Sequence, residues 1–291
     1  MTILDGKKTA QDLKEEIKVA VSEIKKSGKR PPHLAAVLVG DDGASLTYVG
    51  SKVRSCDYVG FDSTLIKLDE RTTEETLLKK IDELNQDDQL DGYIVQLPLP
   101  KHIDEEKILL AIDPTKDVDG FHPSNFGRMA LEMDAFIPAT PFGIIELLER
   151  YKIETSGKHC VVVGRSHIVG RPISILMSQK GPAGNATVTL AHSRTQNLAE
   201  LTKSADIVVM ALGIPEYLTA EMVKEGATII DVGITRVADA NHPKGYGIKG
   251  DVAYDEVAQK AAAITPVPGG VGPMTIAMLL KNTLFAYQRK G

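Results

Sequence analysis

Short, continuous apolar segments recur along the whole chain and alternate with stretches of helical periodicity. The segment 34–40 (LAAVLVG) has no alternating polar positions, which is typical of a strand buried on both faces of a parallel sheet. By contrast, apolar residues recur every three or four positions at Leu13, Ile17, Val21 and Ile24, and so predict one face of a helix. This alternation restricts the chain to an α/β fold.

The first part of the chain repeats a strand-and-helix pattern. Its apolar positions predict a helix over 48–60 and strands over 63–68 and 92–96. Thr72 and Glu75 have the spacing of a capping box, which opens a further helix. Repeated units of this kind favour a parallel sheet covered by helices.

The second part of the chain contains another series of such units. We expect a connecting helix over 144–151, further helices over 172–179 and 273–287, and strands over 159–163, 186–191, 206–211 and 227–232. The predicted fold class is α/β with two lobes, residues 1–139 and 140–272, the second being a Rossmann-type doubly wound sheet. The final segment, 273–291, carries an apolar face and is expected to return to the first lobe.

Composition and charge exclude several classes of function. The chain has 34 basic and 39 acidic residues and a net charge of −5, so no positive field favours nucleic acid or an anionic membrane. Cys56 and Cys160 have no companions at metal-ligand spacing, so neither a metal site nor a disulfide framework is indicated. No signal-peptide pattern and no membrane-spanning apolar run occur, so we expect a cytoplasmic protein.

A glycine-containing turn joins a predicted strand to a predicted helix at 161–172 (VVVGRSHIVGRP). In doubly wound folds such a turn brings backbone N–H groups and a helix N-terminus to a pyrophosphate. The spacing departs from G-x-G-x-x-G, because Ser166 replaces the second glycine and Gly170 comes one position late. A plain turn is the alternative, but the surrounding β–α–β pattern favours dinucleotide binding.

The residues after the next strand indicate which dinucleotide is bound. NAD sites usually carry Asp or Glu there, to bond the ribose 2′-hydroxyl. This strand runs instead into His192, Ser193 and Arg194, without an acid. A hydroxyl and a guanidinium suit a 2′-phosphate, and Arg165 in the glycine turn could reach the same group. We expect NADP rather than NAD, the alternative being a solvated turn with an ordinary arginine.

Two residues in the first lobe are candidates for acid–base chemistry, and a third is a candidate for ligand binding. Tyr48 and Lys52 are four positions apart and share one face of the predicted helix, although a surface pair is the alternative. The pair is also typical of short-chain dehydrogenases, but there it follows the nucleotide-binding turn, whereas here it precedes that turn. Gln96 ends a strand, where open α/β sheets bind ligands; its alternative role is to cap the turn.

Two further segments carry groups that suit a polar, planar ligand. Asp113, Asp117 and Asp119 lack the distal glutamate of a calcium loop, so we expect one carboxylate facing a ligand and the others in solvent. The segment 266–273 (PVPGGVGP) is a stiff loop that exposes backbone groups just before a helix. Such a loop suits a flat heterocycle with several hydrogen-bonding edges.

Taken in order, five motifs resemble one known family over nearly the whole chain. They are Tyr48 with Lys52, the segment 95–100 (VQLPLP), 117–120 (DVDG), 164–172 (GRSHIVGRP) and 266–273. The chain resembles the bifunctional methylenetetrahydrofolate dehydrogenase/methenyltetrahydrofolate cyclohydrolase family, and the unusual glycine spacing is that family's own pattern.

The resemblance implies two reactions at one active site in the cleft between the lobes. 5,10-Methylenetetrahydrofolate gives a hydride to NADP, and water then opens the methenyl product to 10-formyltetrahydrofolate, in one-carbon metabolism and purine biosynthesis. Lys52 is implied as the group that moves the proton, with Tyr48 and Gln96 tuning and positioning it, and Asp119 as the carboxylate that binds the pterin. A homodimer is implied as well.

The remaining site residues are also implied by the resemblance. The substrate contacts are Tyr48, Lys52, Val95, Gln96, Leu97, Asp119, Pro268, Gly269, Gly270, Val271 and Gly272. The NADP contacts are Gly164, Arg165, Ser166, Val169, Gly170, His192, Ser193, Arg194 and Ile234, and no metal is expected. A monofunctional dehydrogenase and a catalytically silent NADP sensor are the two alternatives.

Overall fold

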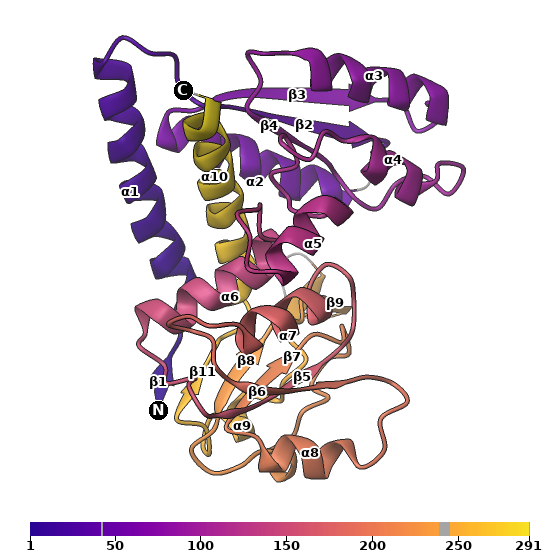
Figure 1. Ribbon diagram of the computed structural model, residues 1–291. Helices are drawn as coiled ribbons and strands as arrows, with labels where there is room; N and C mark the ends of the chain where they lie inside the picture. Colours follow the sequence, from indigo (N-terminus) through magenta and orange to yellow (C-terminus); the bar gives the residue numbers. More distant parts are fainter. Residues whose placement is uncertain (42, 239–244, 291) are drawn as a thin grey trace. The chain divides into compact units, whose positions relative to one another are not determined.

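The computed structural model describes residues 1–41, 43–238 and 245–290 (Figure 1). It divides into two compact units: unit 1 comprises Met1–Ala10 and Thr140–Thr275, and unit 2 comprises Gln11–Ala139 and Ile276–Gly291. The boundary falls inside α1 (Gly6–Lys26) and α10 (Val271–Lys290). The expected first lobe, 1–139, differs from unit 2 at its start, because β1 (Thr2–Ile3) pairs with β11 (Ala263–Ile264) of unit 1.

Unit 2 is built on a three-stranded parallel sheet in the order β3–β2–β4. The central strand is buried from Leu34 to Val39, which explains why its sequence is apolar without alternation. The strands are β2 (His33–Val39), β3 (Asp62–Leu68) and β4 (Gly92–Val95), and the helices are α2 (Gly43–Val59), α3 (Glu74–Gln86), α4 (Glu105–Ala111) and α5 (Pro123–Ala130).

Alternate residues of β2 face two separate cores. Ala35 and Val37 belong to a buried cluster with residues of α3 and α4. Leu34 and Ala36 belong to a second cluster, which includes residues of α2 and the unit 2 parts of α1 and α10. Figure 1 shows α3 and α2 on opposite sides of this sheet. The sheet is therefore covered on both faces, and its loops at the carboxyl edge are the parts left open for a ligand.

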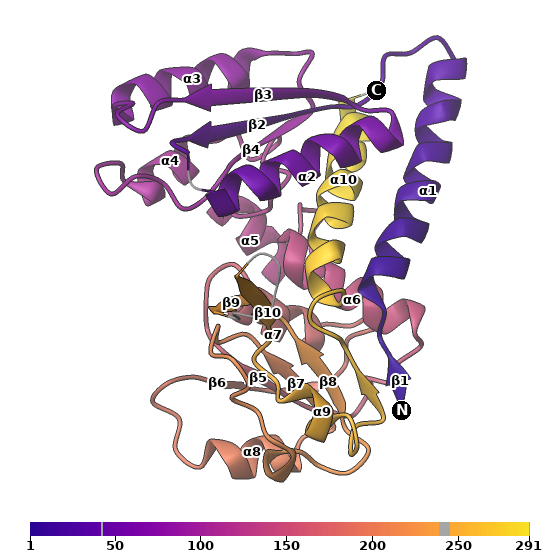
Figure 2. The ribbon, with the colours of Figure 1, turned by 180° about the vertical axis from the view of Figure 1, so that it is seen from behind.

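Unit 1 contains a parallel six-stranded sheet in the order β1–β11–β8–β7–β5–β6. Figure 2 shows its strands β6, β5, β7 and β8 side by side in that sequence. The strand β5 (His159–Val163) lies between β6 (Thr187–Ala191) and β7 (Ile207–Met210), so the strand order reverses at β5. Doubly wound sheets bind ligands at such a switch point, outside the carboxyl ends of the strands. The predicted α/β fold with a Rossmann-like second lobe is confirmed.

The other elements of unit 1 connect or flank this sheet. They are α6 (Ala139–Arg150, whose first residue belongs to unit 2), α7 (Gly170–Ser178), α8 (Leu198–Ser204), the 3-10 turn η1 (Ala220–Met222), β8 (Thr228–Asp231), β9 (Thr235–Ala238), β10 (Tyr246–Lys249) and α9 (Tyr254–Val257). β9 and β10 form an antiparallel pair that was not predicted, because neither strand contains a continuous run of three apolar residues as β4 and β7 do.

Several elements begin earlier than their periodicity predicts. The helix expected over 48–60 begins at Gly43, and the final helix, expected over 273–287, occupies Val271–Lys290. The connecting helix expected over 144–151 begins at Ala139. Glycine, proline and small polar residues dominate these starts, so local propensity understates the helix. The last residue of the expected final segment, 291, lies outside the described residues.

Candidate active site

Lys52 lies on α2 with its side chain almost wholly buried, since the residue is 7% exposed. Its Nζ donates to Gln96 Oε1 at 3.1 Å. Burial lowers the pKa of Lys52, and the nearby carboxylate of Asp119 and thiol of Cys56 oppose that shift. An ammonium here holds its proton less tightly than a free lysine does, so the neutral amine becomes available at a lower pH.

Gln96 is held in place by its own backbone and by the loop that follows β4. Its N–H donates to Val37 O at 2.9 Å, which prolongs the sheet by one residue. Its Nε2 donates to Leu97 O at 2.7 Å, which turns the amide oxygen toward Lys52. Gln96 therefore presents an acceptor to the lysine, and the sheet edge fixes where that acceptor lies.

Asp119 brings a carboxylate to the same group of residues. Burial raises the pKa of Asp119, while the charge of Lys52 lowers it. Its side chain makes no hydrogen bond or ion pair to any residue that the structure describes. The preceding residue, Val118, is held by Asn282 of α10, whose Nδ2 donates to Val118 O at 2.8 Å and to Ile137 O at 3.0 Å. The backbone here is fixed and the carboxylate has no partner among the described residues. Such a carboxylate suits a ligand with two adjacent hydrogen-bond donors.

Asp117 is not solvated, so the expectation for the other aspartates is wrong at this position. It is 2% exposed and its Oδ2 accepts from His122 N at 2.8 Å and from Asn125 Nδ2 at 2.9 Å. Burial raises its pKa to about 6. The turn after Asp119 leaves backbone N–H groups that need an acceptor, and Asp117 supplies one. Asp113 instead accepts from Thr115 N in an exposed turn.

Tyr48 lies one helical turn before Lys52 on α2. Its residue is 37% exposed, and partial burial raises the pKa of its hydroxyl. No hydrogen bond joins Tyr48 to Lys52 in the described part of the chain. The two side chains therefore share a helix face, as the spacing predicts, but the phenol is the more open of the two and the amine the more enclosed.

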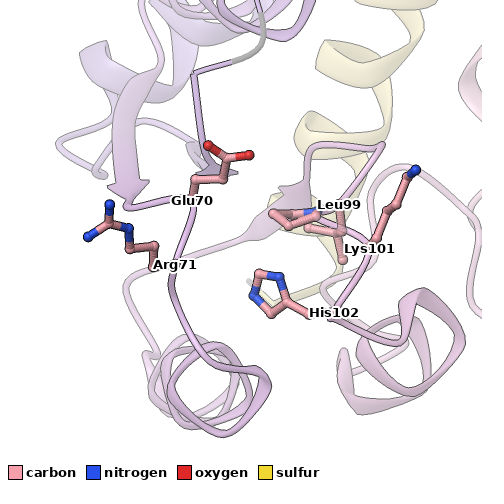
Figure 3. Close-up of a pocket in the computed structure, with 6 residues that line it drawn as sticks. Glu70, Arg71, Leu99, Lys101 and His102 are labelled. Carbon is pink, nitrogen blue, oxygen red and sulfur yellow. The ribbon is translucent and has the colours of Figure 1, made fainter.

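An open pocket of about 760 Å³ lies at the carboxyl edge of the unit 2 sheet (Figure 3). It is formed by the loops that follow β3 and β4, and is lined by Glu70, Arg71, Leu99, Pro100, Lys101 and His102. His102 Nε2 lies 2.9 Å from Thr72 O, a contact that ties the two loops together. The second loop is the one that carries Gln96, so this candidate catalytic residue and the pocket share one edge of the sheet.

The glycine turn of unit 1 is packed too closely for side chains at two positions. Gly164 has φ +124°, and a Cβ there would lie 2.2 Å from Ala211 O. A Cβ on Gly170 would lie 2.0 Å from Gly164 O, so the helix α7 starts in contact with the turn. Ser166 Oγ accepts from the N–H groups of Val169 and Gly170, at the start of α7. The serine that breaks the usual glycine spacing thus joins the turn to the first residue of the helix.

The residues around this turn fit a dinucleotide with an additional phosphate. The backbone N–H groups of 165–168 make no hydrogen bond within the described residues, which leaves them free for phosphate oxygens. Gly164 N donates to Ala191 O at 2.9 Å, so the turn adjoins the end of β6, where His192, Ser193 and Arg194 follow. The side chains of Arg165 and Arg194 are exposed and pair with no described acid.

The loop 268–272 adjoins two other segments of unit 1. Gly269 O accepts from Lys7 N at 2.8 Å, and a Cβ on Gly6 would lie 1.8 Å from Gly270 O. A Cβ on Gly272 would meet Ile234 Cδ1 at 3.0 Å, and Ile234 is 50% exposed. The candidate nucleotide contact Ile234 and the candidate folate loop therefore lie side by side.

The structure thus divides the candidate residues into two groups. Tyr48, Lys52, Val95, Gln96, Leu97 and Asp119 belong to unit 2, whereas the nucleotide candidates and Pro268, Gly269, Gly270, Val271 and Gly272 belong to unit 1. Within unit 2, the lysine, the glutamine and the aspartate come together. Val95 is only 4% exposed, so its backbone rather than its side chain is the group available to a ligand.

Two residues that hold the unit 2 group in place were not predicted from the sequence. Lys116 is 4% exposed, and its Nζ donates to the carbonyl oxygens of Leu84, Asn85 and Asp87. This contact closes the end of α3 and fixes the chain that leads to Asp119. A signal for Asn282 is present in the sequence, because it is the single amide side chain in the mostly apolar segment 274–286 (MTIAMLLKNTLFA). Lys116 gives no comparable signal.

Among the described residues, no helix is long and apolar enough to cross a lipid bilayer. In the same part of the chain, no group of three or more His, Cys, Asp and Glu side chains lies where it could hold a metal ion.

The fold and these residues define a class of protein: an α/β enzyme that binds a dinucleotide on one sheet and carries a buried lysine beside another. Two family models match the chain, the tetrahydrofolate dehydrogenase/cyclohydrolase catalytic domain at residues 4–119 and the NAD(P)-binding domain of the same family at residues 138–291. The chain belongs to the tetrahydrofolate dehydrogenase/cyclohydrolase family.

Individual relatives agree with the family models. The bifunctional protein FolD of Flavobacterium johnsoniae is 73% identical over 286 residues, which are 98% of this chain and 97% of that protein. The crystal structure of the bifunctional FolD methylenetetrahydrofolate dehydrogenase/cyclohydrolase from Campylobacter jejuni has a TM-score of 0.94 and 45% identity and covers 100% of both chains. The Trypanosoma brucei FolD structure, complexed with NADP cofactor and inhibitor, has a TM-score of 0.94 and 38% identity and covers 100% of this chain and 98% of that one.

Family membership assigns the chain a dehydrogenase and a cyclohydrolase activity in one-carbon folate metabolism. The predicted family and bifunctional activity are confirmed at this level, and the monofunctional alternative is not favoured.

Proposed function

We propose that the chain oxidises 5,10-methylenetetrahydrofolate with NADP and hydrolyses the methenyl product to 10-formyltetrahydrofolate, with Lys52 moving the protons of the second reaction. In the first reaction a C–H bond of the methylene carbon breaks and its hydride passes to the nicotinamide. In the second reaction one water is consumed and one proton released. The buried contact between Lys52 and Gln96 is the observation that carries the assignment of roles.

Lys52 acts as the base toward the attacking water. Water adds to the methenyl carbon and one of its protons passes to the neutral amine. The ammonium then returns that proton to the ring nitrogen as the carbon–nitrogen bond breaks, and the remaining hydroxyl proton is released to solvent as the formyl C=O forms. The lowered pKa of Lys52 supports this role, because the amine must be neutral at the start. The amide oxygen of Gln96 accepts one N–H, which directs the lone pair and the other protons of the amine.

The other unit 2 residues bind and orient the folate. The carboxylate of Asp119 accepts from the amino-pyrimidine edge of the pterin, a planar pair of donors that it is free to meet. Tyr48, which is partly exposed, contacts the ring system from the same helix face as Lys52. The backbones of Val95 and Leu97 and the loop 268–272 complete the contacts.

NADP supplies the hydride acceptor when it is bound to unit 1. The free N–H groups of 165–168, with Gly164, Ser166, Val169 and Gly170, bind its pyrophosphate, and Ile234 contacts the nicotinamide end. Arg165 and Arg194, with His192 and Ser193, bind the 2′-phosphate, so NADP is used in preference to NAD. That folate and NADP meet at a single active site stays a prediction, as do the homodimer, a cytoplasmic location and a contribution to purine biosynthesis.

A two-step absorbance assay tests this proposal. Mixing the protein with 5,10-methylenetetrahydrofolate and NADP should produce NADPH, and methenyltetrahydrofolate added alone should lose its chromophore faster than in buffer. NADPH formation without accelerated decay of the methenyl compound would leave a dehydrogenase only. Binding of NADP without either reaction would leave the silent sensor.

A further inference from the structure

Two buried carboxylates in unit 1, Asp231 and Asp251, have no part in the reaction chemistry described above. They are 3% and 0% exposed. Asp231 ends β8, and Asp251 lies two residues after β10. No basic side chain forms an ion pair with either of them within the described residues. Buried carboxylates of this kind cost free energy, so they need partners, and here the partners are backbone N–H groups.

Asp251 fixes the loop that follows β7. Its Oδ2 accepts from Leu212 N at 2.6 Å and from Gly213 N at 3.0 Å. The residue before this loop is Ala211, whose carbonyl oxygen is packed against Gly164 of the glycine turn. The carboxylate therefore holds two consecutive N–H groups directly beside the proposed pyrophosphate site.

Asp231 fixes both Asp251 and the loop that follows β8. Its Oδ1 accepts from Gly233 N and from Asp251 N, each at 2.9 Å, and its Oδ2 accepts from Val252 N at 3.0 Å. Its own N–H donates to Thr265 Oγ1 at 2.7 Å. Burial raises the pKa of Asp231 to about 6, and the charge of Asp251 acts in the same direction.

Neither neighbouring glycine can be exchanged for a larger residue without disturbing the pair. A Cβ on Gly233 would lie 2.4 Å from Asp251 Oδ1, and a Cβ on Gly250 would lie 1.9 Å from Asp231 Oδ2. Asp251 Oδ1 is buried and has no hydrogen-bond partner. No other buried side-chain oxygen or nitrogen of the described residues lacks one. The carboxylate of Asp251 thus reaches the loop after β7 only because position 233 is a glycine, and one of its two oxygens stays without a hydrogen bond.

We propose that Asp231 and Asp251 are positioning residues of the NADP site: together they hold the loops after β7 and β8 in the arrangement that receives the dinucleotide. This inference rests on the proposed function, because it takes the glycine turn and Ile234 as nucleotide contacts. Asp251 acts on the loop beside Gly164, and Asp231 acts on the loop that carries Ile234. Neither carboxylate touches the dinucleotide.

The bifunctional activity supplies a readout that separates positioning from folding. Hydrolysis of added methenyltetrahydrofolate needs no NADP, so a variant with displaced nucleotide loops should keep it. We expect Asp251→Ala to raise the Kd for NADP, measured by isothermal titration calorimetry, about ten-fold or more, as the loss of a charged acceptor of two N–H groups predicts. The kcat for methenyl hydrolysis, measured at saturating substrate because the folate loop 268–272 also lies in unit 1, should stay within about two-fold, since Lys52 and Gln96 belong to the other unit. Asp251→Asn keeps an acceptor oxygen for Leu212 and Gly213 and should restore most of the NADP affinity.

Asp206→Ala is the matched control. Asp206 also accepts from a backbone N–H of the same sheet, that of His159 at 2.9 Å, but at the amino end of β5, opposite to the glycine turn. We expect this variant to bind NADP with the affinity of the unmodified protein. If Asp251→Ala does not fold, Asp251→Ser replaces it, since the loss of the carboxylate that accepts from Leu212 N and Gly213 N should weaken NADP binding by the same selective pattern.

The possible results separate the inference from the function on which it rests. If the unmodified protein binds no NADP, the proposed function itself fails. If that protein binds NADP and Asp251→Ala binds it equally well, the positioning role is overturned. An equal loss of NADP binding and methenyl hydrolysis in folded Asp251→Ala also overturns it, because the effect would then be a general one.

Discussion

The amine of Lys52 and the amide oxygen of Gln96 lie 3.1 Å apart, although 44 positions separate the two residues in sequence. The helix α2 carries the lysine, and the glutamine directly follows β4, the strand that pairs with the central strand β2. The amide accepts one proton of the amine without adding a charge. The lysine therefore keeps the lowered pKa that burial gives it while its orientation is fixed.

Lys52→Met should abolish hydrolysis of methenyltetrahydrofolate while leaving measurable hydride transfer. Methionine keeps the length of the side chain but has no proton to move, and loss of a general base costs about 100-fold or more. NADPH formation and decay of the methenyl chromophore measure the two steps. Lys67→Met, which removes an exposed lysine from β3, is the control and should change neither step. Equal loss of both activities in a folded Lys52→Met protein would refute this separation of roles.

Gln96→Glu should move the pH dependence of hydrolysis to higher pH. Lys52 must be neutral to act as a base, so activity rises with pH through its pKa and then levels off. A carboxylate in place of the amide favours the ammonium and should raise that pKa by about one unit or more. The pH profile of kcat/KM measures the shift. Gln96→Leu, which removes the acceptor without adding a charge, should lower activity without an upward shift, and an unchanged profile for Gln96→Glu would contradict the direct contact.

Asp119→Asn should weaken folate binding and leave NADP binding unchanged. The variant places an amide donor against the donors of the pterin, and loss of a charge-assisted pair should raise the Kd for folate about ten-fold or more. Calorimetric titration with a folate analogue and, separately, with NADP measures both affinities. Asp57→Asn, at an exposed position on α2, serves as the control. Unchanged folate affinity would remove Asp119 from the site.

The double variant Arg165→Ala with Arg194→Ala should lose its preference for NADP over NAD. Both guanidinium groups are exposed near the ends of β5 and β6, where they are free to bind a 2′-phosphate. We expect kcat/KM with NADP to fall about ten-fold or more and that with NAD to change little, since two charge-assisted contacts are lost only for NADP. A preference for NADP that survives both substitutions would contradict the assignment.

Lys116→Met should destabilise the protein without acting on the reacting atoms. The Nζ of Lys116 donates to three carbonyl oxygens at the end of α3, and methionine leaves all three without that partner. We expect the free energy of unfolding to fall by about 3 kcal/mol, the order of magnitude for several buried acceptors left unpaired. Urea unfolding followed by circular dichroism measures the change, with Lys67→Met again as control. An unchanged unfolding midpoint would show that water replaces the amine at no cost.

The sequence by itself determined the features that depend on neighbouring residues. Its continuous apolar runs predicted buried parallel strands, and the four-residue spacing of Tyr48 and Lys52 placed both on one helix face. The order of the glycine turn, its strand and its helix predicted the doubly wound sheet. These features follow from local periodicity and backbone sterics, which act over a few residues at a time.

Only the tertiary structure decided which distant groups meet. The contact of Lys52 with Gln96, the burial of Asp117 and the hold of Asn282 on the chain before Asp119 each join separate elements. The predicted folate contacts also divide between the two units, which no spacing indicates. Such pairings depend on strand order and on the register of one element against another. Local periodicity determines neither, so residue types alone do not predict them.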